Sequence, residues 1–133
     1  MKNILDFKVY YKDTDAEGVV YYANYLGWLE AGRCELLEQM GFSLKKLKEE
    51  QNLVFAIKDV HCEYLRPARL MDKVQVITEI AEIKPARIIF KQKVIRQNDQ
   101  ELLVEALVTA FPIDMGTFKP VRVPKELKQK AGL

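Results

Sequence analysis

The chain has 133 residues, a net charge of +2, one His and two Cys; 49% of its residues are hydrophobic and 30% are charged. It is long enough for one domain of roughly 100–150 residues with a buried core, which excludes a disordered protein. The few Cys and His residues exclude a disulfide-rich secreted fold and a four-ligand zinc site, and the small charge argues against nucleic-acid binding. We expect one domain over residues 1–133, with no metal, no cofactor and no nucleic-acid partner.

The sequence shows no targeting or membrane segment. Met1 to Phe7 alternates polar and apolar residues and lacks the apolar run of a signal peptide. No apolar run approaches the roughly 18 residues that a membrane-spanning helix needs. Cys34 and Cys62 stand within apolar patterns, which favours reduced, buried thiols. We therefore expect a cytoplasmic protein without a transmembrane segment.

The first half of the chain predicts a strand, a loop and a long helix. Phe7 to Lys12 is typical of a short strand, and Asp13 to Gly18 of a turn-rich loop. From about Ala23 to Met40 the pattern is helical, and Gly41 follows where a C-terminal cap is expected. Residues at three- to four-residue spacing share one face of this helix: Tyr25, Leu29, Gly32, Leu36 and Met40. Ser43 to Gln51 predicts a second short helix.

The second half predicts strands in succession. They are Leu53–Leu65, Lys73–Ile83, Arg87–Arg96 and Glu101–Phe111, with a short stretch Val121–Val123 between two prolines. Gln97 to Gln100 forms a good hairpin turn between the third and fourth of them. Because helices do not alternate with these strands, the sheet should be mostly antiparallel, with the long helix covering one face. The fold class is therefore α+β.

The densest polar feature is the sequence DTDAEG, residues 13–18. Asp13, Asp15 and Glu17 repel one another, which favours a carboxylate that acts as base or nucleophile near neutral pH. The helix that follows begins with free N–H groups, which can stabilise an oxyanion. The alternative is that these acidic residues only cap the helix. The spacing does not decide between Asp13 and Asp15.

Four other motifs are weaker evidence for a functional site. The acidic loop resembles the start of a calcium-binding EF-hand, but its twelfth position is Asn24 and a strand precedes it. A D-x-D phosphoryl-transfer site needs a larger α/β domain. His61 and Cys62 are neighbours on a strand, so they point to opposite faces and cannot easily share a proton. Ser43 is the one serine and lies outside any G-x-S-x-G motif, which argues against a serine hydrolase.

Basic residues concentrate late in the chain. They are Lys84, Arg87, Lys91, Lys93, Arg96, Lys119, Arg122 and Lys125. Arg87, Lys91 and Lys93 share one face of their strand, so they form a stripe that suits phosphate groups. An ordinary solvated face is the alternative for any one of them.

Three segments together resemble a known family. They are Val9–Tyr25, Leu29–Glu35 and Glu63–Arg69, the last followed by Asp72. This pattern resembles the hotdog-fold acyl-CoA thioesterases of the 4-hydroxybenzoyl-CoA thioesterase family, including the Tol-Pal-cluster acyl-CoA thioesterases. The resemblance extends from about Phe7 to Val123. It implies a single hotdog thioesterase domain in which a curved, mostly antiparallel five-stranded sheet wraps a long central helix.

The resemblance also implies a site. Asp15 would attack the thioester carbonyl or activate the water that does, and the backbone N–H at Tyr22 would polarise that carbonyl. Some members have His where this chain has Tyr22, which affects only a role for the side chain. The implied substrate-binding residues are Gly18, Val20, Asn24 and Tyr25. Arg87 and Lys91, followed by Lys119 and Arg122, would contact the phosphates of coenzyme A.

The implied reaction hydrolyses an acyl-CoA to a free acid and CoA. The family works as a homodimer or homotetramer with sites between subunits, and acyl carrier protein is a further partner. The alternative is a non-catalytic module of the same fold that binds acyl-CoA or acyl carrier protein. A hotdog dehydratase is more distant, because it pairs a His with an acid and only His61 is present. The sequence leaves the acyl chain open.

Overall fold

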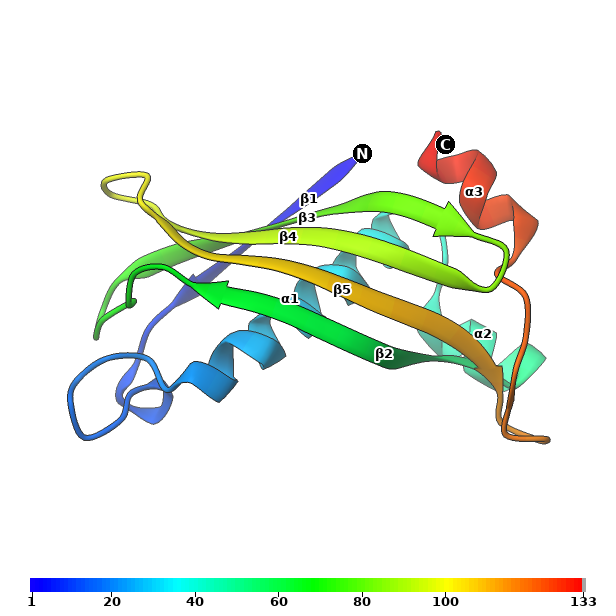
Figure 1. Ribbon diagram of the computed structural model, residues 1–133, viewed down its shortest axis with the longest axis horizontal. Coiled ribbons are helices and arrows are strands. Elements are labelled where there is room, and N and C mark those ends of the chain that lie inside the picture. The colour runs from blue at the N-terminus through cyan, green and yellow to red at the C-terminus, as the bar shows by residue number, and fades with distance from the viewer. Residues whose placement is uncertain (133) are drawn as a thin grey trace.

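A computed structural model describes residues 1–132 (Figure 1). The elements are β1 (Lys2–Lys8), a 3₁₀ turn η1 (Tyr11–Asp13), α1 (Tyr22–Gln39), α2 (Leu44–Gln51), β2 (Leu53–Tyr64), β3 (Lys73–Lys84), β4 (Arg87–Arg96), β5 (Leu102–Asp114), β6 (Lys119–Pro120) and α3 (Lys125–Ala131). The long helix, the short second helix and the four long strands lie where the sequence predicts them. The α+β class is confirmed.

The strands form one antiparallel sheet in the order β1-β3-β4-β5-β2, and the two residues of β6 pair with β5. The sheet thus has six strands, one more than predicted, because Lys119 and Pro120 pair back onto the end of β5. The predicted hairpin turn does join β4 to β5, and Ile95, the penultimate residue of β4, pairs with Leu102, the first residue of β5. The two edge strands are β1 and β2.

The sheet curves around α1 (Figure 1). The predicted helix face is buried in full, with Leu29 and Leu36 completely inaccessible. It packs on the alternate sheet residues that the period of two predicts, such as Val76, Phe90 and Val108. Gly41 adopts a φ of +93°, and its N–H donates to the carbonyl of Glu38, so α1 ends as predicted.

The first strand was predicted in the wrong place. It spans Lys2–Lys8, whereas the predicted range was Phe7–Lys12. Only Phe7 and Lys8 belong to both. The chain leaves the sheet because the Asp13 carboxylate accepts the backbone N–H of Tyr10 at 2.9 Å and holds residues 11–13 in a 3₁₀ turn. A local side-chain hydrogen bond therefore replaces sheet pairing in a segment of strand-forming residues.

The C-terminus also differs from the prediction. Residues 121–123 belong to no strand; the strand lies just before them, and the helix α3 follows Pro124. Leu127 of α3 is fully buried and its neighbours along the chain are polar, so this one side chain, with the partly buried Ala131, holds the short helix on the core. A single buried leucine gives too little periodicity for the helix to be read from sequence.

The two ends of the fold have different contents (Figure 1). The loop of residues 13–18 and the start of α1 lie at one end. The β3–β4 turn and α3 lie at the other end, where the N–H of Val123 donates to the carbonyl of Pro85 at 2.9 Å. Each helix within residues 1–132 is too short or too polar to span a bilayer.

Candidate active site

The acidic loop is a small hairpin that leads directly into α1. Thr14 pairs with Val20 as an antiparallel bridge, the N–H of Asp15 donates to the carbonyl of Val19 at 2.9 Å, and the N–H of Tyr21 donates to the carbonyl of Asp13 at 2.9 Å. Asp15 therefore lies two residue pairs, or roughly 7 Å, from the pair that precedes the helix. The hairpin keeps Asp15 close to the N-terminus of α1.

The loop turns at Gly18, whose φ is +81°. Its N–H donates to the carbonyl of Asp15 at 3.1 Å, which closes the turn. Most residues with a side chain avoid this left-handed conformation. The backbone of the turn therefore explains the glycine at position 18, which was predicted to bind substrate.

Asp13 and Asp15, which the sequence left undecided, occupy different environments. Asp13 is 3% exposed, and its carboxylate accepts hydrogen bonds from the backbone of Tyr10, from Lys12 and from Asn24. Asp15 is exposed, and one of its oxygens, Oδ1, accepts the N–H of Glu17 at 2.8 Å. Its other oxygen has no donor within residues 1–132. Asp13 is thus committed to structure, whereas Asp15 has an oxygen open for chemistry.

The first turn of α1 has unused hydrogen-bond donors. Tyr21 precedes the helix and makes no side-chain cap, and its carbonyl accepts the N–H of Asn24 at 2.9 Å. The N–H groups of Tyr22 and Ala23 have no acceptor among the described residues. These donors carry the positive end of the helix dipole, so they suit an oxygen that gains negative charge.

A small cavity of about 230 Å³ adjoins this helix start. Its lining comes from the start of α1 and the residues before it, and from the end of β2 and the residues after it: Val20, Tyr22, Tyr25, Tyr64, Leu65, Arg66 and Pro67. The Tyr64 hydroxyl donates to the carbonyl of Tyr22 at 3.2 Å, and the ring of Tyr64 stands edge-on to that of Tyr22, with centroids 6.4 Å apart. The C-terminal end of β2 is therefore attached to the first turn of α1.

The predicted substrate-binding residues near the helix have mixed surroundings. Val20 and Tyr25 are 5% and 3% exposed, so they line the cavity as part of the core. The Tyr25 hydroxyl accepts the N–H of Ala68 at 3.0 Å, and burial raises the pKa of this hydroxyl. Asn24 is held by Asp13. Val20 and Tyr25 therefore line the cavity, whereas Asn24 does not, and contact of all three with a substrate stays a prediction.

The predicted phosphate-binding residues are not brought near Asp15 within one copy. Arg87 opens β4 beside Lys84, at the end of the sheet that carries α3. Lys91 stands on the sheet face that points away from α1, since Phe90 and Gln92 on either side of it are buried. The expectation that Arg87, Lys91 and Lys93 share a face is confirmed by this alternation. Their contact with coenzyme A stays a prediction.

The predicted separation of His61 and Cys62 is confirmed. His61 is exposed and lies 3.4 Å from the Glu63 carboxylate, whereas Cys62 is half-buried against the core. Burial raises the pKa of the Cys62 thiol, so it is a weak nucleophile at neutral pH.

Two site residues were missed by reading the sequence. Tyr64 and Arg66 belong to the segment Glu63–Arg69 that carried the family resemblance, but neither was assigned a role there. Tyr64 contacts the helix start, and Arg66 lines the same cavity with its guanidinium 3.6 Å from Glu101. The order of residues gave no signal for this, because the contact joins positions 42 residues apart.

Comparison with known proteins assigns the family. Residues 9–131 match the thioesterase-like superfamily. The chain belongs to this superfamily. The acyl-CoA thioesterase YbgC of Haemophilus influenzae is 43% identical over 121 residues, which cover 91% of this chain and 88% of the relative. The acyl-CoA thioester hydrolase YbgC of Escherichia coli O6:H1 is 37% identical over 120 residues, covering 90% and 88%.

Solved structures agree with the family. A probable thioesterase from Bartonella henselae is 31% identical, has a TM-score of 0.86 and covers 93% of this chain and 100% of its own. The 1,4-dihydroxy-2-naphthoyl-CoA thioesterase Slr0204 of Synechocystis shares the fold at 19% identity, with a TM-score of 0.89 and coverage of 99% and 96%. The predictions of a hotdog fold and of a thioester hydrolase from this thioesterase family are confirmed.

Proposed function

We propose that this chain hydrolyses acyl-CoA thioesters, with Asp15 as nucleophile or general base and the backbone N–H of Tyr22 polarising the thioester carbonyl. The observation that carries the proposal is the pairing of an open carboxylate with free helix donors. One oxygen of Asp15 accepts no hydrogen bond from residues 1–132, and the hairpin of residues 13–21 holds this carboxylate near the start of α1. The relatives named above act on acyl-CoA, which supports this substrate class.

The proposed chemistry follows from the thioester itself. Attack on its carbonyl forms a tetrahedral oxyanion, and a donor at the start of α1 would stabilise that oxyanion by about 3–4 kcal/mol, as single oxyanion donors do elsewhere. The Tyr22 side chain, 61% exposed, is not needed for this step. A thiolate leaves readily, so the reaction needs no strong general acid and one His in the chain is no obstacle.

The backbone around Asp15 suits either role. The N–H of Glu17 fixes Oδ1 of Asp15 at 2.8 Å and so orients the second oxygen of the carboxylate. A fixed carboxylate can attack the carbonyl carbon directly or take a proton from a water molecule. No lysine or arginine forms an ion pair with Asp15 within residues 1–132, so its charge is not neutralised there.

We further propose that a second copy completes the site. The helix-facing side of β2 is only partly covered: Ile57, Val60 and Tyr64 are 44%, 40% and 46% exposed. Leu26 on the nearby flank of α1 is 41% exposed. β2 is an edge strand of twelve residues with unpaired backbone groups, and such edges are normally covered or paired. A second copy would cover this apolar strip and bring its own residues to the site.

Assays of free thiol release test the proposal. A panel of aromatic, short-chain and long-chain acyl-CoA thioesters, and the same acyl groups on acyl carrier protein, should include substrates that the purified chain turns over repeatedly. Binding of CoA thioesters without turnover of any of them would replace the proposal with the non-catalytic binding module. Turnover of carrier-protein thioesters alone would reassign the substrate. The cytoplasmic location stays a prediction.

A further inference from the structure

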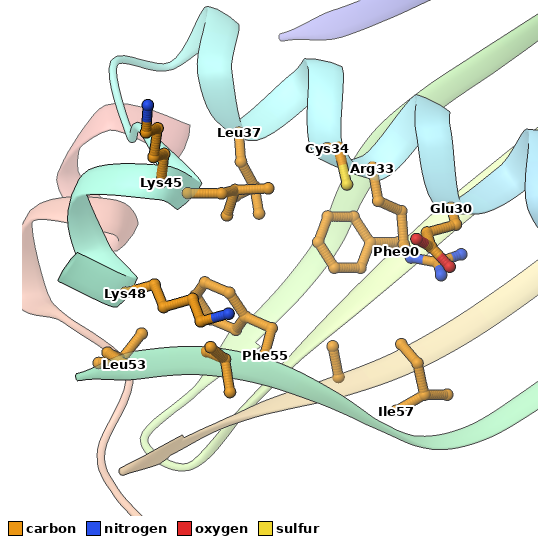
Figure 2. A pocket seen from close by; sticks show the side chains of 13 residues that line it. Glu30, Arg33, Cys34, Leu37, Lys45, Lys48, Leu53, Phe55, Ile57 and Phe90 are labelled. Atoms are coloured by element: carbon orange, nitrogen blue, oxygen red, sulfur yellow. The ribbon is translucent and has the colours of Figure 1, made fainter. Parts of the chain in front are cut away.

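A second, larger cavity of about 460 Å³ lies between α1, α2 and β2 (Figure 2). This volume is within the range of roughly 300–1,000 Å³ that small-molecule pockets occupy. Most of its wall is apolar and includes Leu37, Leu44, Leu53, Phe55, Ile57 and Phe90. The charged residues at the cavity are Glu30 and Arg33 from α1 and Lys45 and Lys48 from α2. None of these residues supplies a reacting group in the proposed hydrolysis, and Ile57 also belongs to the strip of β2 that a second copy would cover.

Arg33 is the unusual member of this wall. It is 9% exposed, yet no Asp or Glu forms an ion pair with it within residues 1–132. Among the described residues, its one side-chain hydrogen bond runs from Nη1 to Oε1 of Gln92 at 3.0 Å. Its Nε and Nη2 atoms have no partner in that part of the chain but are not sealed from solvent. The guanidinium therefore keeps free donors at the cavity.

The position of Arg33 is fixed by its contact with the sheet. Gln92 is fully buried, and its amide donates to the carbonyl of Leu29 and to the hydroxyl of Thr78, each at 2.8 Å. This leaves its oxygen free to accept from Arg33. The network joins α1 to β3 and β4 and prevents the amide from turning. Arg33 is thus a preorganised donor and not a surface side chain folded inward by chance.

Burial of Arg33 has an electrostatic penalty that the chain does not offset. A buried charge is unfavourable unless it is paired, and a neutral amide oxygen supplies only part of the compensation. Burial lowers the pKa of Arg33, and the charge of Glu30 opposes that shift. Glu30 is exposed and three residues earlier on α1, but it makes no ion pair with Arg33. The cavity is therefore complementary to an anion that arrives from outside.

We propose that this cavity binds an organic carboxylate with an apolar body. The carboxylate accepts two hydrogen bonds from the free donors of Arg33, since the guanidinium fork matches carboxylate geometry. The apolar body packs between Leu37, Phe55 and Phe90. Two sources present this chemistry: the free acid released by thioester hydrolysis, and an acyl group with a second carboxylate at its far end. The choice of source rests on the proposed function, but the binding itself does not.

Calorimetry with sodium octanoate and its neutral analogue octanol tests the binding. The wild-type chain should bind octanoate about ten- to hundredfold more tightly than octanol, the range expected for hydrogen bonds to a charged group. Arg33→Met keeps the aliphatic stem and should remove this preference while octanol binding stays unchanged. Glu30→Gln should strengthen octanoate binding severalfold, because it removes a competing and repelling carboxylate. Equal affinities of the wild type for the two probes would overturn the proposal.

The lysines at the cavity provide the matched control. Lys45→Met and Lys48→Met each remove a positive charge from α2, as Arg33→Met does from α1, but leave the hydrogen bonds of Arg33 and Gln92 in place. Each should lower octanoate binding far less than Arg33→Met does. If either abolishes the preference for octanoate while Arg33→Met retains it, the carboxylate lies at α2 and the proposal fails.

Two measurements guard against a variant that fails to fold. Cys34→Phe fills the cavity from α1 and leaves the Arg33–Gln92 contact in place, so it should weaken octanoate and octanol alike by at least tenfold. In the wild type, octanoate should slow alkylation of Cys34, which lines the cavity, and leave Cys62 unaffected, since Cys62 lies outside it. Undiminished binding by Cys34→Phe together with unprotected Cys34 would contradict the proposal.

The source of the carboxylate is decided by kinetics. If it is the released acid, octanoate inhibits the wild type, and Arg33→Met is inhibited at least tenfold less. If it is the far end of the acyl group, the wild type has a kcat/KM for octanedioyl-CoA about tenfold or more above that for octanoyl-CoA, and Arg33→Met loses this difference. If no thioester is hydrolysed at all, the proposed function fails, while the calorimetric result still decides the carboxylate site.

Discussion

The side-chain amide of Asn24 donates to Oδ1 of Asp13 at 3.1 Å and ties the first turn of α1 to the loop that precedes it. Because the same carboxylate also accepts from the backbone of Tyr10 and from Lys12, Asp13 joins three parts of the loop and the helix. Asp15, two residues later, is left facing solvent. Asp13 therefore stabilises the loop, whereas Asp15 is exposed on it.

Removal of Asp13 should destabilise the fold. Asp13→Ala leaves the N–H of Tyr10 and the amide of Asn24 without their acceptor at a buried position, so we expect a loss of about 2–3 kcal/mol in the free energy of unfolding. Glu17→Ala, an exposed change in the same loop, should stay within about 0.5 kcal/mol of the wild type. Urea denaturation measures both. Equal stabilities of the two variants would contradict the structural role of Asp13.

Two glycines of α1 form a matched pair. A Cβ at Gly32 would lie 2.5 Å from the hydroxyl oxygen of Thr78 and 3.0 Å from Val76, so Gly32→Ala must push the helix from the sheet. We expect a loss of about 1–3 kcal/mol in stability. A Cβ at Gly27 meets nothing within 4 Å, so Gly27→Ala should gain about 0.5–1 kcal/mol from helix propensity. Thermal and urea unfolding of both variants check the difference, and a loss at Gly27 as large as at Gly32 would refute the steric reason.

Stability should fall at alkaline pH through the tyrosines at the helix start. Burial, with the contact to Cys62, raises the pKa of Tyr64 to about 12, and burial also raises the pKa of Tyr25, from an ordinary value of 10.0. Between pH 10 and 12 the unfolded chain has released these protons while the folded chain still holds them, so the free energy of unfolding decreases as pH rises. Below pH 10 this contribution is fully present. Tyr64→Phe and Tyr25→Phe should each flatten the decline, and an unchanged slope in both would contradict the assignment.

Association of two copies should depend on β2. Val60→Lys places a charge in the exposed apolar strip of β2 and should yield a monomer with reduced thiol release per chain. Ile4→Lys changes an exposed apolar residue on β1, the other edge strand, and should leave assembly intact. Sedimentation velocity distinguishes the two variants. A monomeric, fully active wild type would remove the proposed role of the second copy.

The sequence predicts the elements that are long enough to show a helical or strand periodicity of apolar residues. The helix of residues 22–39 and the strands β2 to β5 have enough turns or alternations to be recognised, and Gly41 marks where the helix ends. The first strand and α3 were misplaced or missed because single contacts decide them. One is the Asp13–Tyr10 hydrogen bond, and the other is the burial of Leu127. Neither contact has a periodic signature in the sequence.

The candidate site, too, could be predicted only in part from the sequence. The acidic loop and the helix start could be predicted from residue types, but the distinction between Asp13 and Asp15 required their burial and hydrogen bonds. The free donors of Arg33 could not be predicted, because its partner Gln92 is 59 positions away and reaches it only through the sheet. Tertiary contacts of this kind depend on how strands assemble, which local patterns do not encode.

The most direct test of the central claim compares Asp15→Asn with Glu17→Gln in thiol release from acyl-CoA. Both variants neutralise an exposed carboxylate of the same hairpin, so both change the net charge by the same amount and both should keep the fold. We expect kcat to fall by about a hundred- to ten-thousandfold in Asp15→Asn and by no more than a few-fold in Glu17→Gln, with unchanged unfolding of both. Near wild-type turnover by a folded Asp15→Asn variant would contradict it.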